Sequence, residues 1–472
     1  MENLLYKQKN LWDILSKAEK AEIEPYCAAY KTFLDRGKEE HACVRYAIEL
    51  AEAQGFRPYE PNADIKPGTK VYVNNRGKTL YLAVIGKQPI ETGVNIAAAH
   101  VDSPKLDLKP LPLYEDGEMA YLKTHYYGGV RKHQWVAIPL ALYGVVVTRT
   151  GETVEIALGD KPDEPCFTIT DLLPHLSKDQ NKKLLSESYT GEGLNVLIGG
   201  EPWTEAGEET ENQSALNVTK NGKDRIKLSV LKLLNDYYNI TEEDFLSAEL
   251  TFVPAFPARD VGLDRNFIGA YGQDDRACAY AALKALLDLG TPEKTAVVVL
   301  ADKEETGSDG VSGMQSSAFE RFMECITPPQ TTSLTQCFAN SFCISMDVCN
   351  GFDPNYPEVS EKRNSAKLNY GVSVLKYTGA RGKGGTSDAS AETVGKLRQV
   401  FAKADITWQM AELGKVDQGG GGTVAMFMAK RDIDTIDVGV PLLSTHAPFE
   451  IAAKADCYMA YKAALAVFRE MK

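Results

Sequence analysis

The sequence has no apolar run long enough to cross a lipid bilayer. A membrane-spanning helix needs roughly 18 consecutive apolar residues, and the best run, Trp135–Val147, is shorter and contains Pro139. We interpret that run as a buried strand. The N-terminal residues also lack an apolar stretch followed by small residues, so they do not resemble a secretory signal. We therefore expect a cytoplasmic protein that contacts no membrane.

The sequence also lacks the cysteine patterns of disulfide frameworks and thiolate metal sites. Its nine cysteines are odd in number and scattered, and no two of them form a C-x-x-C pair. Disulfide-dense domains are typically short and secreted, whereas this chain has 472 residues. We expect the cysteines to be reduced and mostly buried.

No block of basic residues is present. The 65 acidic and 52 basic side chains give a net charge of -13 that is spread along the chain. Binding to a phosphate backbone needs clustered positive charge, so we expect no nucleic-acid partner. Hydrophobic residues (44%) and charged residues (25%) occur at the levels of ordinary globular proteins, which predicts a chain that folds throughout.

The length of the chain and the distribution of its strand and helix patterns predict two domains, because a single hydrophobic core stops growing well below 472 residues. Residues 107–250 are rich in strand patterns and include a charged loop, Glu201–Arg225, that we expect to be exposed. Strand and helix patterns alternate on both sides of this block. We therefore predict an α/β domain made of residues 1–106 and 251–472, with residues 107–250 inserted as a β-rich domain.

Apolar periodicity predicts the main elements of the α/β domain. The predicted strands cover residues 79–85, 95–100, 295–301, 342–348 and 434–440, and the predicted helices cover residues 43–53, 274–289, 389–404 and 454–472. An N-terminal helix is also predicted, from the spacing of Leu4, Leu5, Leu11, Trp12 and Leu15.

Polar residues with ligand chemistry stand after apolar strands or at the start of a helix in five segments. In open α/β sheets, ligands bind beyond the carboxyl ends of the strands, so these residues are candidates for a site. They are His100 and Asp102, Asp274 with Asp275, Glu304 with Glu305, Asp347, and His446. Taken singly, each has an ordinary structural explanation, such as helix capping by Asp274 or a solvated turn at Glu304.

Taken together, the five segments have the chemistry of a metal site. Neutral imidazoles and carboxylates are ligands that suit zinc, manganese or cobalt. Adjacent carboxylates such as Glu304 and Glu305 repel one another unless cations neutralise them. Three ligating carboxylates and two divalent ions leave one surplus positive charge, which can hold a bridging hydroxide. We therefore predict two divalent ions with that hydroxide as the nucleophile.

The motifs HVDSP, LDLKPLP, QDDRA, KEETGS, SMDVCNGFDPNYPE, VDQGGGGTVA and LLSTHAPFE follow one another across almost the whole chain. In this order they resemble the M18 aminopeptidases, the aspartyl aminopeptidase group, in its bacterial form. The resemblance implies a three-layer α/β sandwich with a central mixed sheet and an inserted β-rich dimerisation or lid domain. It further implies a di-zinc aminopeptidase that acts on peptides with a free N-terminus and assembles as a large homo-oligomer, a tetrahedral dodecamer built from dimers.

The resemblance also implies a set of metal ligands. His100 and Asp347 belong to one metal centre, Glu305 and His446 belong to the other, and Asp274 bridges the two. These ions are zinc in the first instance, with cobalt or manganese as alternatives.

Catalytic roles follow from the same resemblance. Glu304 matches the general base, which takes a proton from the bridging water and passes it to the leaving amine, and Asp102 matches the residue that orients His100. His175, in the segment DLLPHL, matches a histidine that enters the active site of a neighbouring subunit. The alternative for His175 is a place on the face of an amphipathic helix.

Lys376 and the glycine-rich loop with Asp417, Gly419 and Gly420 resemble substrate-binding elements. Glycine lets backbone approach a ligand closely, whereas the alternative for this loop is a flexible hinge. A phosphate-binding loop is excluded because no G-K-[ST] follows.

The chain departs from the family pattern after Asp347. Family members often carry histidines there, where this chain has Asn350 and Asp353. The preferred N-terminal residue of the substrate therefore stays open between acidic and neutral or hydrophobic. A basic pocket for an acidic residue could come from Lys376, Lys383 or Arg381.

Two other functions are compatible with the sequence. One is an N-deacylase or carboxypeptidase on the same two-zinc core, although the sequence does not place the arginine that would bind a substrate carboxylate. The other is a catalytically silent assembly or cargo-binding relative, which would have no need of Glu304 beside metal ligands.

Overall fold

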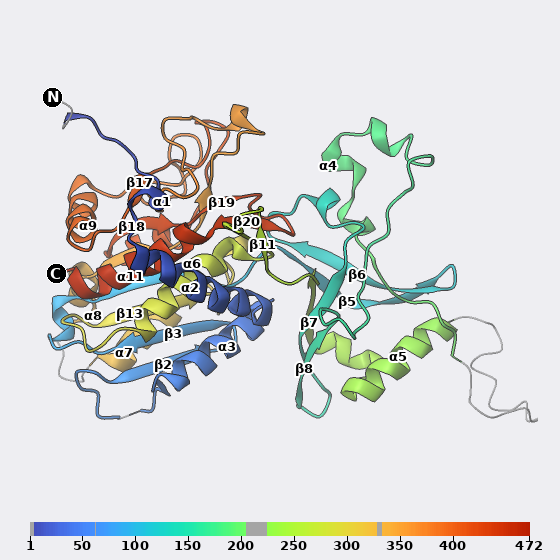
Figure 1. Cartoon of the computed structure of the whole chain (residues 1–472). Coiled ribbons are helices and arrows are strands. Elements are labelled where there is room, and N and C mark those ends of the chain that lie inside the picture. The colour runs from blue at the N-terminus through green and yellow to red at the C-terminus, as the bar shows by residue number, and fades with distance from the viewer. Residues whose placement is uncertain (1–3, 62, 204–223, 328–332) are drawn as a thin grey trace, which may run out of the picture. The chain divides into compact units, whose positions relative to one another are not determined.

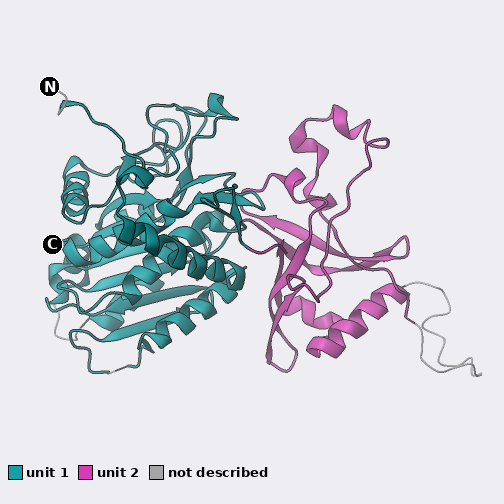
Figure 2. Cartoon of the chain, in the orientation of Figure 1, with its two compact units in different colours: residues 1–103, 258–472 teal, residues 104–257 magenta. Residues whose placement is uncertain are grey.

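The computed structural model describes residues 4–61, 63–203, 224–327 and 333–472 (Figure 1). Residues 204–223 of the predicted charged loop lie outside these ranges. The chain forms two compact units, one of residues 1–103 and 258–472 and the other of residues 104–257 (Figure 2). Among the described residues, no helix has the length and apolar character needed to span a membrane.

Unit 1 is built on a nine-stranded mixed sheet. In spatial order its strands are β1 (Arg57–Pro58), β2 (Lys70–Asn75), β3 (Thr79–Val84), β13 (Ala296–Ala301), β4 (Asn95–His100), β14 (Phe342–Ser345), β18 (Asp434–Gly439), β16 (Val372–Leu375) and β17 (Trp408–Met410). The central strands β13, β4, β14 and β18 are parallel. Strands β3 and β16 pair antiparallel on either side of this group. The predicted mixed sheet is confirmed.

Successive residues of the central strands point to opposite faces, and each face has its own hydrophobic core. One core packs against α2 (Lys17–Arg36), α3 (Glu40–Ala53), α6 (Gln273–Leu287), α9 (Ala391–Lys403) and α11 (Lys454–Glu470). The other packs against α7 (Ala318–Ile326), α8 (Leu334–Ala339) and α10 (Ala425–Ala429). The predicted three-layer sandwich is therefore confirmed.

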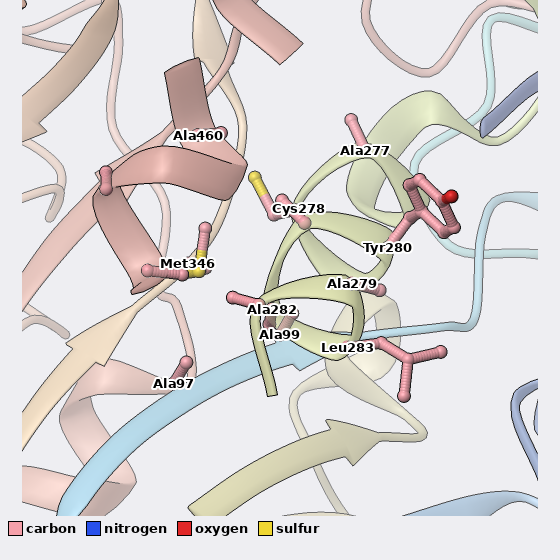
Figure 3. Packing of buried hydrophobic residues seen from close by; sticks show 14 of the residues in the cluster. Ala97, Ala99, Ala277, Cys278, Ala279, Tyr280, Ala282, Leu283, Met346 and Ala460 are labelled. Carbon is pink, nitrogen blue, oxygen red and sulfur yellow. The ribbon is translucent and has the colours of Figure 1, made fainter. Parts of the chain in front are cut away.

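Small side chains line the contact between α6 and strand β4. Helix α6 packs against β4. Ala97 and Ala99 of β4 and Cys278 and Ala282 of α6, labelled in Figure 3, belong to the same core and are fully buried. Close packing of this kind leaves no room for larger side chains. The packing holds the start of α6 at the edge of the sheet, where β4 ends.

Unit 1 also contains a smaller, five-stranded sheet. Its strands, in spatial order, are β11 (Arg259–Val261), β12 (Phe267–Ala270), β20 (Glu450–Ala453), β19 (Pro441–Leu443) and β15 (Cys349–Asn350). Strand β12 leads into α6, β15 follows β14, and β19 and β20 flank a loop that contains His446. This sheet therefore ties together three chain segments that carry candidate ligands.

Unit 2 contains a six-stranded antiparallel sheet, as the strand patterns of residues 107–250 predicted. In spatial order its strands are β8 (Thr153–Leu158), β7 (Leu140–Val147), β10 (Ala248–Pro254), β5 (Lys105–Asp116), β6 (Met119–Tyr127) and β9 (Val196–Gly199). The α-helices among its described residues are α4 (Leu185–Ser188) and α5 (Arg225–Tyr238). Helix α5 buries Ile226, Val230 and Leu234, which recur every four residues on one face.

The predicted N-terminal helix is wrong. Leu4 and Leu5 are exposed, and between Leu4 and Leu15 the one α-helix that the structure describes is the short α1 (Leu11–Ile14). Ser16 then begins a new helix, α2, by a capping box with Glu19. The apolar spacing therefore extends across two separate elements, and the cap at Ser16 determines where the second one begins.

Candidate metal centre

Three neighbouring parallel strands end at one edge of the large sheet. Strand β4 ends at His100, β14 is followed by Asp347, and β13 is followed by the short 3-10 helix η8 (Glu304–Thr306). Because neighbouring parallel strands point the same way, these carboxyl ends lie together. Asp274 reaches the same place from the first residues of α6, and His446 reaches it from the loop between β19 and β20.

Asp274 lies between the two histidines. One of its carboxylate oxygens is 3.3 Å from Nε2 of His100, and the other is 3.1 Å from Nε2 of His446. The side chain is buried, and the backbone of Asp274 and Asp275 is not helical. The Asp274 carboxylate therefore faces two imidazoles, as a ligand shared by two cations would.

The other candidate ligands surround Asp274. Potential ligand atoms of His100, Glu304 and Asp347 lie within 4.8 Å of one another, and so do those of His100, Asp274 and Glu305. Nε2 of His446 is 3.4 Å from Oε1 of Glu305. The structure thus brings together all five predicted ligands and the predicted base.

Asp102 fixes three of these residues. Its Oδ1 accepts a hydrogen bond from the backbone N–H of Glu304, and its Oδ2 accepts one from the backbone N–H of Glu305, both at 3.2 Å. Nδ1 of His100 lies 3.0 Å from the Asp102 carbonyl oxygen and 3.4 Å from Oδ1. With Nδ1 held this way, Nε2 of His100 points toward Asp274 and the remaining ligands.

Glu450 is a residue that the sequence analysis missed. Its Oε1 accepts from the backbone N–H of His446 at 2.7 Å, and its Oε2 accepts from that of Asp274 at 3.1 Å. Glu450 is fully buried at the start of β20. The signal in the sequence was an acidic residue at the head of an apolar strand, four residues after His446.

Asp275 plays a similar structural part. Its Oδ2 accepts from the backbone N–H of His100 at 3.2 Å, whereas its Oδ1 makes no hydrogen bond although it is buried. Together, Asp102, Asp275 and Glu450 hold the backbone of the ligand segments. Buried carboxylates used in this way can align the side chains of candidate ligands.

The pKa values show that the cluster is short of positive charge. Burial, with Asp102 and Asp274 nearby, raises the pKa of Glu304 to about 7 against the pull of His100. Burial also raises the pKa values of Glu305 and Asp347 well above their usual range. These carboxyl groups cannot all be ionised at neutral pH on their own.

The pKa values of the two histidines are raised as well, which favours the charged form of each imidazole. Burial disfavours their charged forms, but hydrogen bonds to Asp102 and Asp274 raise the pKa of His100 well above its usual value. Asp274 and Glu305 likewise overcome burial and raise the pKa of His446 to about 10. Divalent cations would supply the missing positive charge, so that the carboxylates ionise and the imidazoles stay neutral.

The residues present therefore fit a metal centre. Oε1 of Glu305 is buried and makes no hydrogen bond, which is costly for a carboxylate unless a cation lies against it. Imidazole nitrogens and carboxylate oxygens are the donors that zinc takes.

The cluster borders a cavity of about 690 Å³ in unit 1. Gly419 and Gly420 line this cavity, whereas Lys376 and Asp417 are not among its lining residues. A Cβ at Gly419 would lie 1.7 Å from the Leu413 carbonyl oxygen. A glycine is therefore required at position 419, where the backbone passes close to that of Leu413. Contact of Lys376 and Asp417 with the substrate stays a prediction.

His175 lies in unit 2, exposed and within a turn of residues 174–176. The alternative of an amphipathic helix face is wrong, because no helix forms there. Leu172, Leu173 and Leu176 beside it are at least half exposed. The predicted role in a neighbouring subunit's site stays a prediction.

Comparison with known proteins agrees with the resemblance. The profile of the aminopeptidase I zinc metalloprotease (M18) family matches residues 33–468. A probable M18 family aminopeptidase 1 from Clostridium acetobutylicum is 46% identical over 464 residues, which are 97% of either chain. The crystal structure of an M18 aminopeptidase from Thermotoga maritima has a TM-score of 0.91 and 43% identity, covering 99% of this chain and 100% of that one.

A more distant yeast protein, mApe1, shares the fold with a TM-score of 0.75 at 19% identity over 96% of this chain and 98% of its own. It was solved as a dodecamer. At that identity, the comparison concerns the fold alone. The family profile and the closer bacterial relatives together show that the chain belongs to the M18 family of zinc metallo-aminopeptidases.

Proposed function

We propose that this chain removes single residues from the free N-termini of peptides with two divalent ions, zinc in the first instance. The observation that carries the proposal is the position of Asp274, whose two carboxylate oxygens face different histidines. His100 and Asp347 would hold one ion, and Glu305 and His446 would hold the other. Two ions, when bound, would supply a water of lowered pKa and a positive field for the scissile carbonyl and the free amine.

Glu304 is the general base in this proposal. Its carboxylate lines the cavity and lies 3.8 Å from Nε2 of His100, while Asp102 holds its backbone. Even without ions its pKa is raised to about 7, mainly by burial. A carboxylate in this position can take a proton from water and return it to the leaving amine.

The cavity composition favours this function over an N-deacylase or carboxypeptidase. Those enzymes must bind a substrate carboxylate, which calls for a cation near the metals. No lysine or arginine is among the residues that the structure describes as lining the cavity. A silent assembly or cargo-binding role has no use for Glu304 beside the ligands.

We further propose that the active form is a homo-oligomer, in which His175 acts in a neighbouring subunit. The support is the exposure of His175 among the exposed leucines Leu172, Leu173 and Leu176, which are suited to burial against another copy of the chain. The dodecamer of the yeast relative is consistent with a tetrahedral dodecamer built from dimers. The cytoplasmic location stays a prediction.

The test is a side-by-side assay of the purified full-length protein. It is stripped with a chelator and reconstituted with zinc, cobalt or manganese. We expect hydrolysis of aminoacyl anilides with a free amine only in the reconstituted samples, and none of N-acetylated anilides or N-acyl amino acids. Cleavage of the acylated substrates, or full activity in the stripped protein, would contradict the proposal.

A further inference from the structure

Four consecutive glycines, Gly419–Gly422, form part of the cavity wall, since all four line it. Glycine has no side chain that could be anchored, and its backbone has more accessible conformations than that of other residues. The N–H of Gly419 donates to the Lys415 carbonyl and the N–H of Gly421 donates to the Thr378 carbonyl, both at 2.9 Å. The conformation of this glycine run therefore depends strongly on what holds its two ends.

Thr423 supplies the first side chain after the glycine run, and it also lines the cavity. Its Oγ1 donates a hydrogen bond to Oδ1 of Asp437 at 2.7 Å and accepts one from the backbone N–H of Ala425 at 3.3 Å. Both partners are buried, with Thr423 8% and Asp437 1% exposed. This bond therefore ties the end of the glycine run to the large sheet, just before helix α10 begins.

Asp437 lies on strand β18, where it pairs with Ser345 of β14 on one side and with Leu375 of β16 on the other. Its Oδ2 is buried and has no hydrogen-bond partner of normal geometry among the described residues. A buried polar atom without a partner is costly, whereas an apolar side chain of the same shape would avoid that cost. The stability of the sheet therefore does not account for a carboxyl group here, but the bond to Thr423 does.

We propose that Asp437 is a positioning residue for substrate binding, which holds Thr423 and the adjoining glycine run in the conformation that receives the peptide. This inference rests on the proposed aminopeptidase function. The N–H groups of Gly420 and Gly422 donate to no backbone acceptor in the described part of the chain, so they can bind a carbonyl group of a peptide. Asp437 is not among the lining residues that the structure describes, and it acts on the peptide through Thr423.

The expected kinetic effect follows from this indirect role. Loss of the anchor should weaken the binding of the peptide without changing the groups that carry the reaction. We therefore expect KM to rise about 10-fold and kcat to change by less than about threefold.

The sharpest test replaces both partners at once in the full-length, metal-loaded protein. Thr423→Val combined with Asp437→Leu keeps the shape of both side chains, and removing both polar partners together can be neutral or stabilising. We expect this double variant to keep its metal, to melt no earlier than the parent, and to show the higher KM. The substrates are tripeptides with a free amine whose first residue is alanine, leucine or glutamate.

Conservative variants and a matched control complete the test. Thr423→Ser keeps the hydroxyl and Asp437→Asn keeps an acceptor oxygen, so both should retain KM within about twofold of the parent. Thr435→Val is the control, because Thr435 is a buried residue of the same strand that does not line the cavity and whose Oγ1 donates to the Ile433 carbonyl. Its KM should equal that of the parent.

The possible outcomes are distinct. A parental KM in the folded double variant would overturn the inference and leave the aminopeptidase function intact. A double variant that does not fold would show that the pair serves the stability of the sheet, which would also overturn the inference. Hydrolysis of none of the tripeptides by the parent would instead overturn the proposed function, and the inference with it.

Discussion

Glu304 and Glu305 are adjacent in the sequence but have different surroundings. The Glu305 carboxylate lies 3.4 Å from His446, whereas that of Glu304 lies on the side of His100. Both backbone N–H groups are held by Asp102. A single anchored turn can therefore present one carboxylate as a ligand and the other as a base.

The first prediction at the residue scale concerns Glu304→Gln. We expect kcat to fall by about 10²–10⁴-fold, because an amide cannot carry a proton between water and the leaving amine. Metal content, measured by elemental analysis of the dialysed protein, should stay near that of the parent. Glu305→Gln serves as the contrast and should lose metal. Substantial turnover by metal-loaded Glu304→Gln would refute the proton transfer assigned to this residue.

The second residue-scale prediction concerns Glu450→Gln. A glutamine has one acceptor oxygen, so its amino group would face one of the two N–H groups, of Asp274 and His446, that Glu450 now holds. We expect metal affinity to fall about 10–100-fold, as is usual when a group that supports a ligand is lost. Competition with a chromophoric chelator measures this affinity.

Two further measurements separate positioning from general destabilisation. Excess metal should restore most of kcat in Glu450→Gln, since the residue acts through the ligands. Glu49→Gln is a control, because Glu49 is more than half exposed and pairs with Arg36 at the surface. Unchanged metal affinity in Glu450→Gln would return Glu450 to a purely structural role.

At the scale of elements, helix α2 shows how a helix start is coupled to its neighbour. Lys462 of α11 donates to Glu19 at 2.6 Å, and the N–H of Ser16 donates to the same carboxylate at 3.0 Å. The Lys462 hydrogen bond and the Ser16 N–H, against burial, lower the pKa of Glu19 to about 2. The ionised carboxylate thus caps α2 and joins it to α11.

The pH dependence of this contact follows from the sign of the shift. Because the pKa of Glu19 is lower in the folded state than its usual value of 4.5, its contribution is present above about pH 4.5. The contribution is lost as the pH falls from there toward 2. We expect Glu19→Gln to cost about 1 kcal/mol at pH 7, since the partly exposed pair is screened by water.

Chemical denaturation of parent and variant at several pH values checks this. The difference in unfolding free energy should shrink steadily below pH 4.5. Glu22→Gln, at an exposed position of the same helix, is the matched control and should show no such trend. A penalty that is constant from pH 7 to pH 3 would exclude the charged contact as its cause.

At the scale of the whole molecule, the second unit carries the segment with His175. We expect His175→Phe to lower kcat while metal content and oligomer size stay unchanged. Light scattering after size exclusion measures the oligomer, and His125→Phe, another exposed histidine of unit 2, is the control. Unchanged kinetics in an intact oligomer would remove His175 from the active site.

Mixing the two impaired variants Glu304→Gln and His175→Phe tests whether His175 acts between subunits. If subunits of Glu304→Gln and His175→Phe exchange, some sites of the mixed oligomer combine an intact Glu304 with an intact His175 from a neighbour. The activity of the mixture should then exceed that of either variant alone. Mixed oligomers that form without such a gain in activity would show that both residues must belong to the same chain.

Much of the fold and of the site could be predicted from local patterns. The apolar runs before His100, Glu304 and Asp347 form buried strands of one sheet. A strand whose side chains are apolar on both faces is removed from water only when it lies in the interior of a sheet that is covered on both sides. The parallel order of these strands then places their carboxyl ends together. The prediction of an N-terminal helix was wrong because the apolar spacing of residues 4–15 does not show that Ser16 begins a separate helix.

The sequence by itself determined which residues have ligand chemistry and where they stand relative to the strands, because both properties are local. Only the tertiary structure decided that Glu450 holds the backbone of Asp274, which is 176 residues away. It also decided that Leu375 lines the cavity and the neighbouring Lys376 does not. Contacts between distant segments, and the face on which a side chain emerges, depend on packing of the whole chain, and no local pattern encodes that packing.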